Sequence, residues 1–493
     1  MLIKFENVKT EYLPDTEVKI DDKKYLIHGV INGEDILVDT DSKYPKLKEI
    51  IKKSPERIED GCIFQNECGG CRFMHINYEY EKQLKQQFLN DLFKPFGFKN
   101  IPFTGMENPY NYRNKCQMTY KLSKSKKVVS GLYEEYTHNI ITVSNCLLQS
   151  EKANDVINVL NKVLTKNKIQ PYDEKTRTGI IRHVYIRYGF NSKQLMLVIV
   201  TNGEMFPGRN NVIKDLNKEN IGITTIVQNY NSRDTSIVLG DRERVLYGPG
   251  FIYEYVSDYK FKISPRSFFQ INTNGMNIIY NKAIEYAKIK NTDIVIDAYC
   301  GVGTISIFAS KYAKKVIGVE LNKNAIVDAK INAKINNINN IEFLADDATN
   351  FMTHLAKNKE HVDVVIMDPP REGSTKQFID AIGYLKPRRV IYVSCDPKTL
   401  KRDLYLFSDN DYIVKRIEGV DMFPRTQHIE SFAILERDNE IDELEALVRK
   451  NNTKKYNENK IRYIPKADIE MMREDKYEAN GFKNNKKRRW LNA

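Results

Sequence analysis

Two residues near the C-terminal end of the sequence have types and settings that suit covalent catalysis. Cys395, in VIYVSCDPKTLKRD, follows an apolar strand and precedes a helix. A thiol near a helix N-terminus and a basic side chain such as Lys398 is expected to have a lowered pKa and to act as a nucleophile. Glu430, in DMFPRTQHIESFAILE, comes just after His428 and begins the next apolar strand, so it is the candidate general base. Simpler interpretations stay open, because Cys395 could be a buried packing residue and Glu430 a solvated one.

A glycine-rich turn earlier in the chain predicts a cofactor site on the same sheet edge. In VIDAYCGVGTISI a hydrophobic strand ends at Asp297, and Gly301 and Gly303 would let the backbone approach a ligand at the start of the next helix. The turn lacks the third glycine of the dinucleotide fingerprint, so alone it could be merely structural. No phosphate-binding lysine loop accompanies these motifs. An adenosine without phosphates is therefore expected, and S-adenosylmethionine is the natural candidate.

Acidic residues end the neighbouring predicted strands. Glu320 ends VIGVE and could accept hydrogen bonds from ribose hydroxyls, although it could also cap the helix that follows. Asp346 and Asp347 follow another strand and could bracket the adenine, and Asp368 opens the turn DPPR. The carboxyl ends of parallel strands meet at one edge of a sheet, so these acids are expected beside the glycine turn.

Four cysteines form a candidate metal site: Cys62, Cys68, Cys71 and Cys146. Three of them are close together in CIFQNECGGC, and the fourth lies far along the chain in VSNCLLQ. Three close cysteines with a distant fourth resemble iron–sulfur ligation more than the paired spacing of a zinc ribbon. Spacing alone does not decide between iron–sulfur and zinc, and chance clustering of reduced thiols stays open.

The elements that must position these residues divide the chain into four parts. Residues 1–56 alternate short β-like runs and predict a small β unit, and residues 57–248 predict a mixed α/β middle domain that carries the cysteines. Residues 249–437 repeat the pattern strand, glycine-rich turn and helix, which predicts a doubly wound, mainly parallel, Rossmann-like sheet. Residues 438–493 are rich in Asn and Lys and predict a flexible basic tail.

Composition limits the function classes. The net charge of the 493 residues is +12, and the segment from Arg449 onward contributes +8 of it, with 14 Lys or Arg against 6 Asp or Glu. Basic charge attracts polyanions but does not identify the partner. An odd total of seven cysteines argues against a secreted disulfide scaffold. The start has no apolar signal core and no stretch is long enough to span a membrane, so a soluble cytoplasmic monomer is expected.

The motifs taken together resemble those of the RNA (uracil-5-)-methyltransferase family. The resemblance covers Ser54 to Arg437 and rests on CGGC with the upstream Cys62, SPRSFFQIN, DAYCGVG, VIGVE, MDPPR, SCDPKTLKRD and FPRTQHIE, in the family's order. It implies a Cys395 nucleophile and a Glu430 proton acceptor. It also implies that four residues contact S-adenosylmethionine, namely Gln270, Tyr299, Glu320 and Asp368. The four cysteines would hold a 4Fe–4S cluster, which favours 23S ribosomal RNA as the substrate, with transfer RNA possible.

The chemistry of such a family requires both catalytic groups. Carbon 5 of uracil is too poor a nucleophile to take a methyl group unaided, and addition of the Cys395 thiolate at carbon 6 gives it carbanion character. The adduct still carries the carbon 5 proton, which Glu430 would remove so that the thiolate is eliminated. The target base must leave its stack, and aromatic side chains near Phe268 and Phe269 are expected to help.

The sequence departs from the family pattern in three places. Only the segment from Lys24 to Arg57 resembles a TRAM domain, the RNA-binding β-barrel of many relatives, so the barrel is expected to be abbreviated. The usual Asn after the nucleophile is Asp396, which is expected to raise the pKa of the Cys395 thiol. The common Asn after the second turn glycine is Thr304.

Three rival functions fit the residues less well. Methyltransferases that make 5-methylcytosine in RNA carry a second cysteine at the DPP-like motif, where this chain has Arg371. Adenine amino methyltransferases expect an aromatic residue after that turn and need neither Cys395 nor Glu430. A non-catalytic RNA-binding assembly factor would have no use for an intact pair of these residues.

Overall fold

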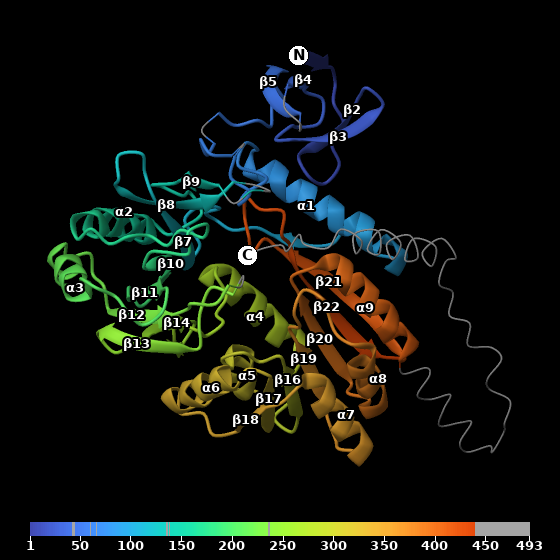
Figure 1. Ribbon diagram of the computed structural model, residues 1–493. Helices are drawn as coiled ribbons and strands as arrows, with labels where there is room; N and C mark the ends of the chain where they lie inside the picture. The colour runs from blue at the N-terminus through green and yellow to red at the C-terminus, as the bar shows by residue number, and fades with distance from the viewer. Residues whose placement is uncertain are drawn as a thin grey trace, which may run out of the picture.

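The computed structural model describes residues 1–41, 45–59, 61–65, 67–134, 137, 139–234 and 237–438 (Figure 1). The predicted basic tail therefore lies outside the described residues. Three β-rich regions follow one another along the chain. Among the described residues, no helix combines the length and apolar character needed to cross a membrane.

The N-terminal region is a small all-β unit, as predicted. β1 (Leu2–Phe5), β4 (Asp35–Asp39) and β5 (Lys46–Lys52) form one antiparallel sheet, and β2 (Asp15–Ile20) pairs with β3 (Lys23–His28). Alternate apolar residues of these strands point inward, so Val18, Ile27, Ile36 and Val38 share one buried core. This core belongs to residues 1–50 and is separate from the larger cores that follow.

The middle region is a mixed α/β layer built on a seven-stranded sheet. In spatial order its strands are β13 (Arg242–Tyr247), β12 (Thr225–Tyr230), β11 (Leu195–Thr201), β10 (Ile181–Tyr188), β7 (Lys115–Leu122), β8 (Val128–Tyr133) and β9 (Ile140–Thr142). The helices α2 (Glu151–Lys166) and α3 (Arg209–Lys218) bury apolar residues such as Leu160 and Val212 in a core shared with β10 and β11. A hairpin of β14 (Ile252–Val256) and β15 (Tyr259–Ile263) follows.

The C-terminal region holds the predicted doubly wound sheet. In spatial order the strands are β18 (Ile341–Ala345), β17 (Lys315–Glu320), β16 (Ile294–Ala298), β19 (Val364–Met367), β20 (Arg389–Ser394), β22 (Glu430–Arg437), β21 (Tyr412–Val420) and β6 (Phe103–Thr104). β18, β17, β16, β19 and β20 are parallel, whereas β22 is antiparallel to both of its neighbours. The strand order reverses beside β16, which in open α/β sheets is where ligands bind.

Helices cover both faces of this sheet. α4 (Thr273–Ala287) and α5 (Thr304–Ser310) pack in one core with Val364 and Ile366. On the other face, Val365 and Met367 share a core with residues of α7 (Ala348–Asn358), α8 (Lys376–Leu385) and α9 (Pro397–Asp409). α6 (Lys323–Ile335) packs against β18 and β15. Successive residues of a strand point to opposite faces, which explains how one short apolar strand serves both cores.

Two elements from early in the chain join this sheet. β6 pairs in parallel with β21, and α1 (Tyr78–Phe93), followed by the short helix η1 (Lys94–Phe96), packs beside α9 (Figure 1). Leu89 and Phe93 of α1 are buried in the core that α7, α8 and α9 share. Residues 78–104 therefore complete the C-terminal layer, although the sequence pattern had grouped them with the middle region.

Candidate active site

Cys395 and Glu430 lie at the same end of two neighbouring strands. β20 and β22 are antiparallel and pair Ser394 with Ser431. Cys395 is the residue after Ser394, and Glu430 is the residue before Ser431. The two residues are therefore the next opposite positions beyond this pair. Glu430 is 2% exposed, and its Oε1 has no hydrogen-bond partner. A buried carboxyl oxygen without a partner is unusual in a folded protein, and its hydrogen-bonding capacity is open to a bound ligand.

The expected lowering of the Cys395 pKa is wrong. Burial raises the pKa of Cys395 to about 12, and the charges of Glu430, Asp368 and, more weakly, Asp396 add to the rise, while Arg371 opposes it. The N-terminus of α9 does not lower the pKa of the thiol in return, because the carboxylate of Asp396 already accepts the backbone N–H groups of the first turn of α9. The predicted effect of Asp396 on the thiol is confirmed.

Three buried carboxyl groups, those of Asp297, Asp368 and Glu430, lie close enough together that all of them raise the pKa of Tyr280. Burial raises the pKa of Asp297 to about 7 and that of Asp368 to about 7. The pKa of Glu430 rises well above its ordinary value, first through burial and then through repulsion by Asp368, and Arg371 partly offsets this. Oδ1 of Asp297 has no partner, whereas its Oδ2 accepts a hydrogen bond from Ser306 at 2.5 Å. Such a set of acids would bind a cationic ligand favourably.

The glycine turn has the predicted strand-to-helix position. Gly303 precedes α5 with a φ of +81°, and a Cβ there would lie 2.6 Å from the Phe343 ring. Gly301 has a φ of +54°, and a Cβ there would meet no protein atom within 4 Å. Oε2 of Glu320 accepts a hydrogen bond from the backbone N–H of Gly301 at 3.2 Å, which joins the end of β17 to the turn. Asn322, not Glu320, caps α6.

The other predicted cofactor residues lie around this turn. Tyr299 has a φ of +67°, and its hydroxyl is 3.2 Å from the hydroxyl of Ser374. Gln270 hydrogen-bonds through its side chain to Tyr280, a buried residue of α4 whose pKa is raised by burial and by three nearby carboxylates, those of Asp368, Asp297 and Glu430. Sequence reasoning missed Tyr280, because an apolar helix face gives no sign of which aromatic residue borders a site.

Four further predicted residues have different surroundings. Asp346 is exposed after β18, and Asp347 caps α7 by accepting the backbone N–H of Asn350. Phe268 is 60% exposed and free to contact another molecule. Phe269 is 3% exposed and lies in the core beside Phe261, so Phe268 is the one of the pair that another molecule can reach, and help from aromatic residues in base flipping stays a prediction. Successive residues of an extended segment point to opposite sides, which explains the contrast.

The four candidate metal-binding cysteines line a single cavity of about 210 Å³, together with Cys116, Arg113 and Lys115. Burial raises the pKa of Cys62, Cys68 and Cys71, and the charge of Cys146 adds to each rise. In the described part of the chain, no group of three or more His, Cys, Asp or Glu side chains converges so that it could hold a metal ion. Metal binding therefore stays a prediction.

Comparison with known proteins gives a consistent result. The profile of the tRNA (uracil-5-)-methyltransferase family matches residues 254–438. An RNA methyltransferase of Clostridium tetani is 38% identical over 425 residues, which are 85% of this chain and 92% of the relative. One from Oceanobacillus iheyensis is 39% identical over 430 residues, 86% of this chain and 90% of the relative. The crystal structure of Pyrococcus abyssi tRNA (uracil-54, C5)-methyltransferase with S-adenosyl-L-homocysteine has a TM-score of 0.70 at 25% identity, and covers 87% of this chain and 100% of that one.

Proposed function

The chain belongs to the RNA (uracil-5-)-methyltransferase family, and from this premise we propose that it methylates carbon 5 of a uridine through a covalent adduct with Cys395. The family is one of S-adenosylmethionine-dependent RNA methyltransferases. The observation that carries the proposal is the position of Cys395 and Glu430 at the same end of the paired strands β20 and β22, with Oε1 of Glu430 buried and without a hydrogen-bond partner.

The glycine turn and the acids around it suit the cofactor. When bound, S-adenosylmethionine supplies an electrophilic methyl group, and its positive charges would be neutralised by acids such as Asp368 and Asp297. Glu320 would accept hydrogen bonds from the ribose, and Tyr299 and Gln270 would also contact the cofactor. The free Oδ1 of Asp297 and the open space at Gly301 are features of this chain that fit such a ligand.

The proposed reaction assigns one task to each catalytic group. Because the pKa of Cys395 is raised to about 12, the thiol first gives up its proton to solvent. Sγ then adds to carbon 6 of uracil as a thiolate, and the electron pair of the carbon 5–carbon 6 double bond makes carbon 5 nucleophilic. After carbon 5 has been methylated, the Glu430 carboxylate takes the remaining carbon 5 proton. The double bond then re-forms, and the carbon 6–sulfur bond breaks to release Cys395 as a thiolate. Phe268, which is exposed, could stack on the flipped base.

The cysteine cavity supports 23S ribosomal RNA as the preferred substrate. A 4Fe–4S cluster is larger than a single ion, so its four thiolates surround a volume instead of converging on one point. A cavity lined by Cys62, Cys68, Cys71 and Cys146 fits that requirement, with Arg113 and Lys115 as nearby cations. By the resemblance, this cluster is typical of family members that act on ribosomal RNA. Transfer RNA is the second candidate, because the Pyrococcus abyssi relative acts on transfer RNA.

The test is to trap the adduct. The purified protein and S-adenosylmethionine are incubated with 23S fragments or transfer RNA in which uridine is replaced by 5-fluorouridine. Fluorine cannot leave as a proton, so the adduct should accumulate and survive denaturation. An adduct that disappears in Cys395→Ala supports the proposal and identifies the RNA class. If neither RNA forms an adduct, the proposed covalent chemistry is wrong.

A further inference from the structure

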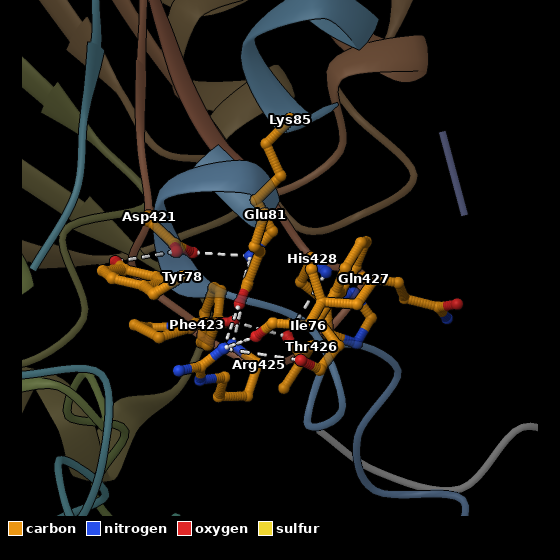
Figure 2. Close-up of polar contacts among 12 residues, drawn as sticks. Ile76, Tyr78, Glu81, Lys85, Asp421, Phe423, Arg425, Thr426, Gln427 and His428 are labelled. Atoms are coloured by element: carbon orange, nitrogen blue, oxygen red, sulfur yellow. Dashed lines mark hydrogen bonds and ion pairs between the residues drawn. The ribbon is translucent and has the colours of Figure 1, made fainter. Parts of the chain in front are cut away.

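The loop that joins β21 to β22, residues 421–429, ends at Glu430 and is held by a buried network of charges. Figure 2 shows Lys85 and Glu81 of α1 pointing toward Asp421 and Arg425 of this β21–β22 loop. Lys85 is fully buried, and its ammonium group donates hydrogen bonds to Glu81 Oε1 at 2.7 Å and to Asp421 Oδ1 at 2.7 Å. Tyr78 donates a further hydrogen bond to Asp421 at 3.0 Å. The network therefore combines two acids, Glu81 and Asp421, with two bases, Lys85 and Arg425.

Arg425 is held both through its backbone and through its guanidinium group. Its backbone N–H donates to Glu81 Oε1 at 2.7 Å, and its carbonyl accepts hydrogen bonds from the backbone N–H groups of Arg72 and Phe73. Its guanidinium donates to the carbonyl of Ile76 at 2.7 Å and to the hydroxyl of Tyr110 at 2.8 Å. The guanidinium carbon also lies 5.2 Å from the centre of the Tyr78 ring and 4.8 Å from that of Tyr110.

The backbone at Arg425 shows how strongly these contacts act. Arg425 has a φ of +69°, a left-handed conformation that costs about 1–2 kcal/mol for a residue with a Cβ. Strained backbone of this kind persists only where the surroundings determine it, and it is concentrated at functional sites. A buried ionic network also adds little stability over apolar packing of the same volume. Stability alone therefore does not account for this arrangement at the loop.

Hydrogen bonds within the loop hold the residues that lie between Arg425 and Glu430, the proposed base. The hydroxyl of Thr426 donates to the carbonyl of Phe423 at 2.8 Å and accepts the backbone N–H of His428 at 3.3 Å. The carbonyl of Gln427 accepts a hydrogen bond from Tyr12 at 2.5 Å. Between His428 and Glu430 only the buried Ile429 intervenes. Four residues, 426–429, therefore separate Arg425 from Glu430, which begins β22 and pairs with Val420 of β21.

We propose that Arg425 and Glu81 are positioning residues that aim the Glu430 carboxylate at the carbon 5 proton of the methylated adduct. This rests on the proposed function. The step affected is the last one, in which Glu430 takes the carbon 5 proton, the ring double bond re-forms and Cys395 leaves as a thiolate. Formation of the carbon 6–sulfur bond does not use Glu430 and should be spared.

The test compares the buried Arg425 with the partly buried Arg57. Arg425→Met removes the guanidinium from the loop. The control Arg57→Met removes a guanidinium outside the loop, where Arg57 pairs with the buried Glu34 at 2.6 Å. Each variant reacts once with natural uridine RNA and cofactor carrying a labelled methyl group. A misplacement near 1 Å can slow a reaction step by about 100-fold, so Arg425→Met should accumulate labelled, denaturation-resistant protein–RNA adduct. Glu430→Gln should do the same, and Arg57→Met should not.

The same variants with 5-fluorouridine RNA separate positioning from a general loss. Arg425→Met should form that adduct at close to the wild-type rate, because proton removal plays no part in it. The proposal is overturned if Arg425→Met slows both reactions equally, or if it clears its natural adduct as fast as Arg57→Met does. If Arg425→Met does not fold, Glu81→Gln decides by the same two readouts. A wild-type protein that forms no 5-fluorouridine adduct contradicts the proposed function instead.

Discussion

The carboxylate of Asp396 accepts the backbone N–H groups that begin α9, so these donors are not available to the neighbouring Cys395. The N–H of Lys398 donates to Asp396 at 2.9 Å and that of Thr399 at 3.3 Å. A thiolate at Cys395 would have to compete for the same donors and would also face the charge of Asp396. The cap that stabilises the helix therefore opposes ionisation of the nucleophile.

Alkylation of Cys395 by iodoacetamide should be slow at neutral pH and rise with pH toward 12. Because the pKa of the thiol is raised to about 12, the thiolate fraction grows about tenfold for each pH unit below that value. Peptide mass spectrometry would follow Cys395 among the seven cysteines. Asp396→Asn keeps a capping side chain and removes a negative charge, so it should speed alkylation, whereas Asp347→Asn, in the cap of α7, should not. A rate that levels off below pH 9 would contradict the assignment.

Alanine at the two turn glycines should separate cofactor binding from stability. Gly303→Ala would place a Cβ 2.6 Å from Phe343 at a φ of +81°, and should destabilise the fold by about 1–3 kcal/mol. Gly301→Ala meets no protein atom within 4 Å and should cost only about 1 kcal/mol, but its methyl group would enter the space proposed for the cofactor. Calorimetric titration with S-adenosylhomocysteine and thermal unfolding measure the two effects. If both variants lost cofactor affinity and stability to the same extent, the assignment of stability to Gly303 and cofactor binding to Gly301 would be wrong.

The C-terminal sheet could largely be predicted, since most of its strands are apolar runs with a polar residue at or just after the carboxyl end. Asp297, Glu320, Asp368 and Cys395 lie at the carboxyl ends of strands as expected. The contribution of α1 could not be predicted, because an amphipathic pattern shows that a helix buries one face but not against what.

The charge network shows the same limit. Glu81 and Lys85 have the spacing of an exposed helical ion pair, and only the contact with Asp421, 336 positions from Lys85, makes them buried. In the same way, the sequence does not tell which of Phe268 and Phe269 points outward.

Removing Lys85 should destabilise the protein, and more strongly as pH rises. Burial raises the pKa of Glu81 to about 7, so protonation of Glu81 stabilises the folded state below its unfolded value of about 4.5, and this contribution is lost as pH passes through 7. Lys85→Met removes the cation that opposes the rise and leaves buried carboxylates uncompensated. Urea unfolding should show a loss of about 3–5 kcal/mol at pH 8 and a smaller loss at pH 5.

The matched control for this measurement is Lys376→Met on α8. Lys376 pairs with Asp380 at 2.6 Å, also four residues apart, but both side chains are largely exposed. Its removal should change stability by less than about 0.5 kcal/mol at either pH. A Lys85→Met variant that behaved like this control would mean that water reaches the network.

Iron content should depend on the four cysteines and not on the fifth cysteine that lines the same cavity. Anaerobically prepared protein should contain iron and inorganic sulfide in equal amounts, and Cys71→Ser should lose both together with the visible absorption of the cluster. Cys116 is buried in strand β7 and also lines the cavity, yet it lies outside the proposed ligand set. Cys116→Ser should therefore keep its iron and sulfide. If Cys71→Ser and Cys116→Ser both lost their iron and sulfide, the cavity would need all five thiols for packing. If the wild-type protein contained zinc and no sulfide, the site would hold a single zinc ion and not a cluster.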